Sequence, residues 1–143
     1  MTRVQRQSEG IKKGNPQDHT DAVYRVMDFL IRYNVRKNWE YIEEYPVLFD
    51  MVFCAKDKCR GDYSHKYDLV VKNNRGKIIL FIEVDGPKHD KQIQKLNDQR
   101  AERYASYKYP KVPFIRLDKT EINGEPIDSY NYMKEKLVDF IKK

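Results

Sequence analysis

Apolar residues recur at helical spacing in the first patterned segment of the chain. Asn15 and Pro16 supply a helix cap and a first-turn proline. The residues behind them give a helix one apolar face, at Val23, Val26, Met27, Leu30 and Ile31. The pattern predicts an amphipathic helix that ends near Asn34.

Residues 1–14 lack any apolar period. They are polar and carry four cations, Arg3, Arg6, Lys12 and Lys13. Such a segment predicts a disordered basic arm, in which Lys12 and Lys13 are candidates for binding phosphate. The rest of the 143-residue chain, residues 15–143, is long enough for one domain with a hydrophobic core and too short for two.

The pattern changes after the first helix. Residues 40–53 are rich in aromatic and β-branched side chains but contain Pro46, which indicates one bent or edge strand or two short ones. Residues 54–66 are polar and predict a loop. Residues 67–71 and 77–84 are apolar and β-branched, and the turn sequence between them predicts a hairpin.

A helix, a strand and a second helix are predicted in the last third of the chain. After the Gly86-Pro87 break, one face of a helix is marked by Ile93, Leu96, Arg100, Ala101 and Tyr104. Residues 112–117 form a short apolar strand, and its place after a helix is typical of a crossover to a parallel neighbour. A final amphipathic helix is predicted from Tyr130, Met133, Leu137, Val138 and Ile141.

The hairpin brings acidic residues together. If its loop centres on Arg75-Gly76, with Asn74 paired to Lys77, then Asp68 lies opposite Glu83. Directly opposed residues have Cβ atoms roughly 5 Å apart, and the strand period of two places Asp85 on the same face as Glu83. The sequence therefore predicts three carboxylates in one patch.

Carboxylates this close repel one another unless a cation lies among them. One or two carboxylates, with water and substrate phosphate in the remaining positions, suit Mg²⁺ or Mn²⁺ better than Zn²⁺. Asp68, Glu83 and Asp85 are therefore candidate metal ligands, and the Val84 carbonyl is a possible further one. The competing interpretation is that these acids are solvated residues at strand ends.

Net charge points to the partner. The chain carries 28 Lys and Arg against 22 Asp and Glu, a formal charge of +6, which favours an anionic partner such as nucleic acid. Candidate phosphate-binding residues on the helix after the acids are Lys91, Lys95, Arg100 and Arg103. The two arginines also have the spacing of an ion-paired helix face.

The sequence also predicts where the protein is located and whether its cysteines are reduced. The sequence shows no membrane span and no signal segment, so we expect a cytoplasmic protein without a membrane partner. Cys54 and Cys59 are then expected to be reduced, structural thiols. A zinc site built from these thiols and His65 is a weaker alternative, because a fourth ligand is not apparent.

With both the element order and the acids in view, the chain resembles the PD-(D/E)XK nuclease superfamily. The shared core is a helix, three antiparallel strands, a helix and a strand, and the resemblance covers residues 16–118. Within it, Glu83-Val84-Asp85-Gly86-Pro87-Lys88-His89 is similar to the E-(V/I)-D-G-x-x-H signature of the branch related to very-short-patch-repair endonucleases. The resemblance implies a restriction-endonuclease-like α/β fold with a mixed central sheet flanked by helices, here extended by a C-terminal helix.

The resemblance also implies an activity. A Mg²⁺-dependent or Mn²⁺-dependent endonuclease is expected, most readily one that acts on DNA. The oligomeric state stays open, although a small nuclease that cuts both strands usually works as a homodimer. The lysine that the superfamily places two residues after the glutamate is replaced by Asp85, so Lys88 or His89 must handle the attacking water, and the resemblance favours His89. The missing lysine raises the alternative of a nucleic-acid-binding module that has the fold without catalysis. A further alternative is a structural or assembly subunit whose basic surface packs on nucleic acid.

Overall fold

The computed structural model describes residues 3–5, 17–61, 63–86 and 92–141. It is an α/β structure built on one mixed sheet with the strand order β1-β2-β3-β4-β5. The strands are β1 (Arg3–Gln5), β2 (Glu40–Leu48), β3 (Ser64–Lys72), β4 (Ile78–Asp85) and β5 (Phe114–Asp118). β3 pairs antiparallel with both β2 and β4. At the two edges, β1 pairs in parallel with β2, and β5 pairs in parallel with β4.

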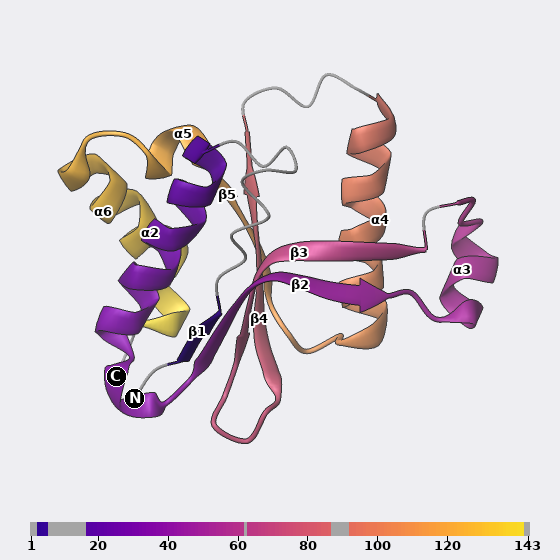
Figure 1. Cartoon of the computed structure of the whole chain (residues 1–143), viewed down its shortest axis with the longest axis horizontal. Coiled ribbons are helices and arrows are strands. Elements are labelled where there is room, and N and C mark those ends of the chain that lie inside the picture. Colours follow the sequence, from indigo (N-terminus) through magenta and orange to yellow (C-terminus); the bar gives the residue numbers. More distant parts are fainter. Residues whose placement is uncertain (1–2, 6–16, 62, 87–91, 142–143) are drawn as a thin grey trace.

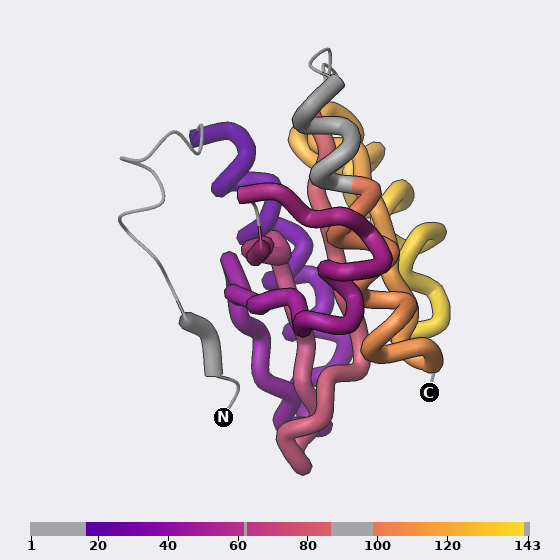
Figure 2. The backbone as a smooth tube through the Cα atoms, turned by 90° about the vertical axis from the view of Figure 1, so that its right-hand side faces the viewer, coloured from indigo at the N-terminus to yellow at the C-terminus, as the bar shows by residue number. Residues whose placement is uncertain are grey.

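Helices cover both faces of the sheet (Figure 1). One face carries α2 (Gln17–Tyr33), α5 (Lys119–Ile122) and α6 (Pro126–Lys136), and the other carries α4 (Gln92–Lys108). A short helix, α3 (Met51–Asp57), lies at the far end of β2 and β3, on the same side as α4. Figure 2 shows the molecule from that side.

The strand period of two divides the core into two clusters. Leu69, Val71, Leu80 and Ile82 face α2 and pack with its buried apolar stripe. Val70 and Phe81 face the opposite way and, together with Tyr67 from the far part of β3, pack against Ala101 and Ala105 of α4. Small residues on α4 allow the helix to approach the aromatic rings closely, and the Tyr67 hydroxyl donates to the Ala101 carbonyl at 2.7 Å.

A third cluster attaches α3 to α4. It contains Phe49, Phe53 and Tyr104, whose ring centroids are 4.8–5.4 Å apart. Asp50 caps α3, because its side chain accepts a hydrogen bond from the Phe53 amide at 2.8 Å. The sequence prediction of a strand to Phe53 followed by a loop was wrong here: β2 ends at Leu48 and α3 takes up the apolar residues that follow.

Two other predictions need correction. Residues 3–5 lie in strand β1 rather than in a structureless arm, while the other residues of the predicted arm lie outside the described part of the chain. The C-terminal region is not one long helix: α6 begins with Pro126 in its first turn and ends at Lys136, and a 3-10 turn (Val138–Phe140) follows. The predicted first helix, hairpin, α4 and β5 are confirmed apart from their ends.

The hairpin reaches the predicted register by a different route. Its loop is longer than predicted, since the Asn73 amide donates to the Lys77 carbonyl at 2.9 Å, so the predicted pairing of Asn74 with Lys77 was wrong. A bulge between Val71 and Lys72 then shifts the pairing by one residue. Beyond the bulge, Leu69 pairs with Ile82, which is the register that places Asp68 beside Glu83.

The sheet divides at this point. β3 pairs with β4 only as far as Leu69 and Ile82, whereas β2 and β3 stay paired out to Leu48 and Ser64, and β4 stays paired with β5 out to Asp85 and Asp118. Figure 1 shows the β2–β3 pair turning away from β4 toward α3. Asp68 and Glu83 are the first residues beyond the last β3–β4 pair, at the base of this fork.

Candidate active site

The side chains of Asp68 and Glu83 each accept a hydrogen bond from a backbone amide on the opposite strand of the fork. The Asp68 amide donates to Glu83 Oε2 at 3.1 Å, and the Val84 amide donates to Asp68 Oδ2 at 2.7 Å. Each carboxylate therefore satisfies a backbone amide at the point where the ladder between β3 and β4 has ended. This arrangement fixes both acids at the point where the strands separate.

The pKa values of the two acids are shifted in opposite directions. Glu83 is only 6% exposed, and burial together with the neighbouring charge of Asp68 raises the pKa of Glu83 well above its ordinary value. Burial also opposes ionisation of Asp68, but hydrogen bonds with His19, Glu83 and the Val84 amide outweigh it and lower the pKa of Asp68. The pair thus favours one negative charge over two.

His19 reaches the acids from the first turn of α2. Its Nε2 lies 3.4 Å from Asp68 Oδ2 and 3.2 Å from the Val84 carbonyl oxygen. The hydrogen bond with Asp68 raises the pKa of His19, although burial acts in the other direction. The imidazole nitrogen therefore lies where two oxygen acceptors from β3 and β4 converge.

A second histidine lies on the other side of Glu83. His65, in β3, has its Nε2 at 2.6 Å from Glu83 Oε1. Its ring also packs edge-on against Tyr67, with centroids 4.7 Å apart. His65, Glu83, Asp68 and His19 form a continuous row of titratable groups that crosses the fork.

Asp85 does not join the other two acids. It points toward β5, where Arg116 Nη1 contacts both of its carboxylate oxygens at 3.2 Å, and the same guanidinium donates through Nε to Glu102 at 3.0 Å. The parallel register explains this placement, because Arg116 pairs with Glu83 and lies next to Asp85 on the neighbouring strand. The expectation of three acids in one patch is corrected to two acids, with an ion pair beside them.

The predicted cationic residues fall into two groups. Arg100 and Arg103 both bind Asp57: Arg100 Nε at 2.7 Å, and Arg103 Nε and Nη2 at 2.8 Å. These arginines therefore connect α4 to α3. Lys12, Lys13, Lys88, His89 and Lys91, and the side chain of Lys95, lie outside the described residues.

Sequence reasoning missed His19 and Arg116, and it considered His65 only as a zinc ligand with Cys54 and Cys59. His65 contacts Glu83 instead, and across the described ranges no three side chains of Asp, Glu, His or Cys are placed to hold one metal ion. His19 is far from Asp68 in the chain, so no local pattern identifies it. Arg116 is likewise 31 residues from Asp85 in the chain and lies on a different strand, so no local pattern connects the two.

The oxygen atoms at the fork nevertheless fit a hard divalent cation. Asp68 Oδ2 and the Val84 carbonyl converge on one nitrogen of His19, and Glu83 is held in a buried position beside them. Mg²⁺ typically binds through one or two carboxylates and keeps its remaining positions for water and phosphate. Burial and the neighbouring charge of Asp68 raise the pKa of Glu83, and a cation here would favour its ionised form.

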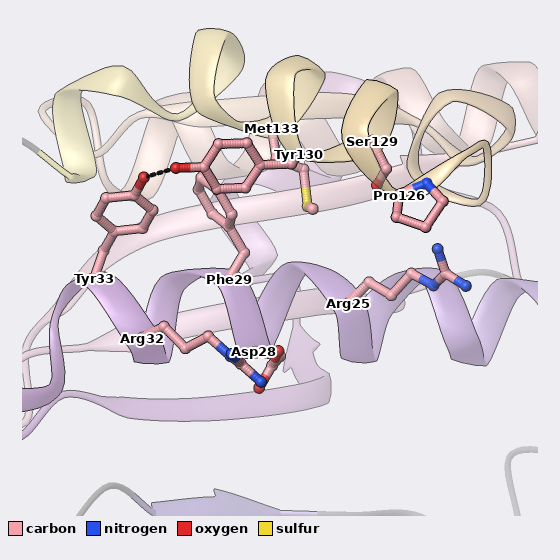
Figure 3. A pocket seen from close by; sticks show the side chains of 9 residues that line it. All are labelled: Arg25, Asp28, Phe29, Arg32, Tyr33, Pro126, Ser129, Tyr130 and Met133. Atoms are coloured by element: carbon pink, nitrogen blue, oxygen red, sulfur yellow. Dashed lines mark hydrogen bonds and ion pairs between the residues drawn. The ribbon is translucent and has the colours of Figure 1, made fainter.

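A separate groove of about 570 Å³ lies between α2 and α6 (Figure 3). It is mainly apolar and aromatic, and a hydrogen bond between Tyr33 and Tyr130 closes one end. Its arginines are already engaged, Arg32 with Asp28 and Arg25 with the Ile122 carbonyl. None of the acids at the fork lines this groove, so it is separate from the candidate active site.

Comparison of the chain with protein-family models, with curated proteins and with solved structures finds no match to any of them. In the part of the chain that the structure describes, no helix combines the length and apolar character needed to cross a membrane.

Proposed function

We propose that this chain is a divalent-metal-dependent nuclease that hydrolyses nucleic-acid phosphodiesters, in the manner of a PD-(D/E)XK endonuclease acting on DNA. The observation that carries the proposal is the crossed pair of hydrogen bonds that holds Asp68 and Glu83 where β3 and β4 separate. Two carboxylates fixed at an open fork of a mixed sheet are what a Mg²⁺ or Mn²⁺ site for phosphate chemistry requires.

Asp68, Glu83 and the Val84 carbonyl would hold the cation. When bound, the cation would acidify a water molecule and neutralise charge that develops on the phosphate oxygens. The acids contribute by position: Asp68 is fixed by the Val84 amide, and Glu83 by the Asp68 amide and His65. Neither side chain needs to reorganise to present an oxygen atom at the fork.

Hydrolysis requires a group that accepts a proton. A water oxygen forms the new bond to phosphorus, its proton passes to a basic side chain, and the bond from phosphorus to the leaving oxygen breaks. We assign the basic role to His89, Lys88 or His19, of which His19 is placed beside Asp68 Oδ2 and the Val84 carbonyl. Arg116 keeps a positive charge near the acids while it pairs with Asp85 and Glu102.

Two observations favour the alternative of a binding module without catalysis. Asp85, which stands where the superfamily has its lysine, is engaged by Arg116, and His19 already offers a cationic partner to Asp68. A protonated His19 would balance the charge of the site without a metal ion. The module would bind nucleic acid through its basic surface and leave it intact.

A cleavage assay separates the two functions. Purified protein is incubated with plasmid, single-stranded DNA and RNA in Mg²⁺, Mn²⁺ or EDTA, alongside Asp68→Asn, Glu83→Gln and the control Asp28→Asn. Asp28 pairs with Arg32 on the exposed face of α2, away from the fork. Metal-dependent cleavage that both fork variants lose and the control keeps supports the nuclease; binding without cleavage supports the module.

A further inference from the structure

The far end of the β2–β3 pair exposes large apolar side chains to solvent. Leu48 is 74% exposed, Met51 87%, Val52 58% and Tyr63 50%. Leu48 ends β2, Met51 and Val52 begin α3, and Tyr63 lies just before β3. We call these four residues, together with Lys56, Lys58, Arg60 and Lys66, the tip surface. Four large apolar side chains exposed within one short excursion of the chain indicate a surface with a binding role.

The exposure follows from the way α3 is attached. Phe53 and Asp57 lie on the side of the helix that faces α4, where Phe53 packs with Tyr104 and Asp57 binds two arginines. Met51 and Val52 point away from that side, because successive residues are turned by about 100° around a helix, and Lys56 is exposed at its edge. The contacts of Phe53 and Asp57 with α4 therefore fix the orientation of α3 and leave its other side exposed to solvent.

The same excursion carries a surplus of exposed cations. Lys56, Lys58, Arg60 and Lys66 are all exposed, and no acidic partner for them is found within the described ranges. The acids nearby are already balanced: Asp50 lies 3.8 Å from Lys108 Nζ, and Asp57 is bound by Arg100 and Arg103. The tip surface therefore combines uncompensated positive charge with apolar and aromatic area.

We propose that the tip surface binds nucleic acid, with its cations on phosphates and its apolar and aromatic side chains on bases. The assignment rests on the proposed function and specifies where the substrate is held. Cations interleaved with stackable side chains are the combination that nucleic-acid surfaces use. The location agrees, since β3 leads from the tip directly to His65 and Asp68, so a strand held at the tip extends toward the fork.

A second copy of the chain fits this surface less well. A two-fold dimer places the same patch on both subunits, so the lysines and the arginine of one tip would face those of the other. The like charges would then repel across the interface, with no described acid free to offset them. A polyanion satisfies both the cations and the exposed apolar side chains.

The test measures binding without cleavage. Fluorescence anisotropy of labelled single-stranded and duplex DNA is recorded in EDTA over a series of salt concentrations. Lys56→Gln/Lys58→Gln is compared with Lys134→Gln/Lys136→Gln, which removes the same charge at the same spacing from α6 on the other side of the sheet. The tip variant is expected to bind more weakly and to reduce the salt slope by about 1.8 for duplex DNA; the α6 variant is expected to leave the slope unchanged.

A second pair of variants tests the apolar component. Met51→Ser/Val52→Ser is expected to weaken binding of single-stranded DNA roughly tenfold, because base contacts are lost. Ile127→Ser, at a residue 66% exposed on α6, serves as the control and is expected to have no effect. Thermal melts of all variants verify that each is folded, which the high exposure of the replaced residues favours.

The outcomes also separate this proposal from the proposed function. Tip variants that bind like their α6 controls overturn the tip assignment, even if the wild-type chain cleaves DNA. The assignment is equally overturned if the wild-type chain binds no nucleic acid, or if light scattering shows a dimer that Met51→Ser/Val52→Ser converts to monomers with unchanged DNA binding. Tip-dependent binding by a chain that never cleaves supports the tip and refutes the nuclease.

Discussion

Asp68 and Glu83 are joined by the backbone of one and the side chain of the other: the Asp68 amide donates to Glu83 Oε2 at 3.1 Å. The contact forms where the β3–β4 ladder has ended one residue earlier, and the Glu83 side chain rather than a strand carbonyl satisfies this amide. The arrangement places a buried carboxylate against a second carboxylate, which favours the protonated form of Glu83.

Glu83→Gln should stabilise the metal-free protein at neutral and alkaline pH. Because the pKa of Glu83 is raised in the folded state, the native protein holds a proton that the unfolded chain releases, and stability falls as pH rises from the ordinary glutamate value through the raised one. Each unit by which the pKa is raised corresponds to about 1.4 kcal/mol of this loss. Glutamine avoids the loss and can keep the contacts with the Asp68 amide and His65.

Thermal melts in EDTA at a series of pH values measure this effect. The difference in Tm between Glu83→Gln and wild type should be largest above the raised pKa of Glu83 and shrink toward the ordinary glutamate range. Asp28→Asn, at an exposed ion pair, is the control and should show little pH dependence. A variant that is less stable than wild type at high pH would contradict the raised pKa.

Two tyrosines should respond oppositely to loss of the hydroxyl. Tyr41 is fully buried and its hydroxyl has no hydrogen-bond partner among the described atoms, whereas the Tyr67 hydroxyl donates to the Ala101 carbonyl at 2.7 Å. Tyr41→Phe should therefore be neutral or raise the free energy of unfolding by about 1 kcal/mol, and Tyr67→Phe should lower it by about 1 kcal/mol. Urea unfolding curves of the two variants give both values, and equal effects would show that the hydroxyl environments do not differ.

Asp57→Asn should loosen α3. Its carboxylate accepts hydrogen bonds from both Arg100 and Arg103, so the change leaves two guanidinium groups without their anion and should cost about 2 kcal/mol. The pKa of Asp57 is lowered by the same arginines, so the stabilisation should be present at neutral pH and be lost as pH falls below the ordinary aspartate range. Hydrogen exchange of the α3 amides should report the local loss, while unchanged protection there would argue against the clamp.

His19→Gln should slow cleavage without preventing substrate binding. The imidazole lies beside Asp68 Oδ2 and the Val84 carbonyl, and a group that moves a proton at such a position contributes about 100-fold or more to the rate. Single-turnover rates at saturating Mn²⁺ measure the effect, with Gln17→Ala, in the same first turn of α2, as the control. A rate equal to that of wild type would assign the proton transfer to Lys88 or His89 instead.

The fold and part of the site were predictable from local sequence patterns. The alternation of residues in the hairpin correctly placed Asp68 beside Glu83, although the loop and the bulge that produce this register were not foreseen. The helix α3 was missed because its apolar residues continue the composition of β2; Asp50, a capping residue three positions before Phe53, was the signal that it begins there.

The rest of the site depends on tertiary contacts. His19 and Arg116 reach the acids from α2 and β5, and the partners are too distant in the chain for any periodic pattern to connect them. Periodicity correctly assigned Asp85 to the same side of β4 as Glu83. It could not show that the neighbouring strand supplies an arginine that pairs with Asp85.

The most direct test of the account is whether the fork binds a divalent cation. Isothermal titration calorimetry of Mn²⁺ and Mg²⁺ into EDTA-stripped protein at pH 7.5 compares wild type with Asp68→Asn/Glu83→Gln and with Asp28→Asn. The account predicts saturable binding by wild type and Asp28→Asn, and none by the fork variant in a folded state verified by circular dichroism. Wild-type protein that takes up neither ion, or a fork variant that takes them up equally well, would contradict it.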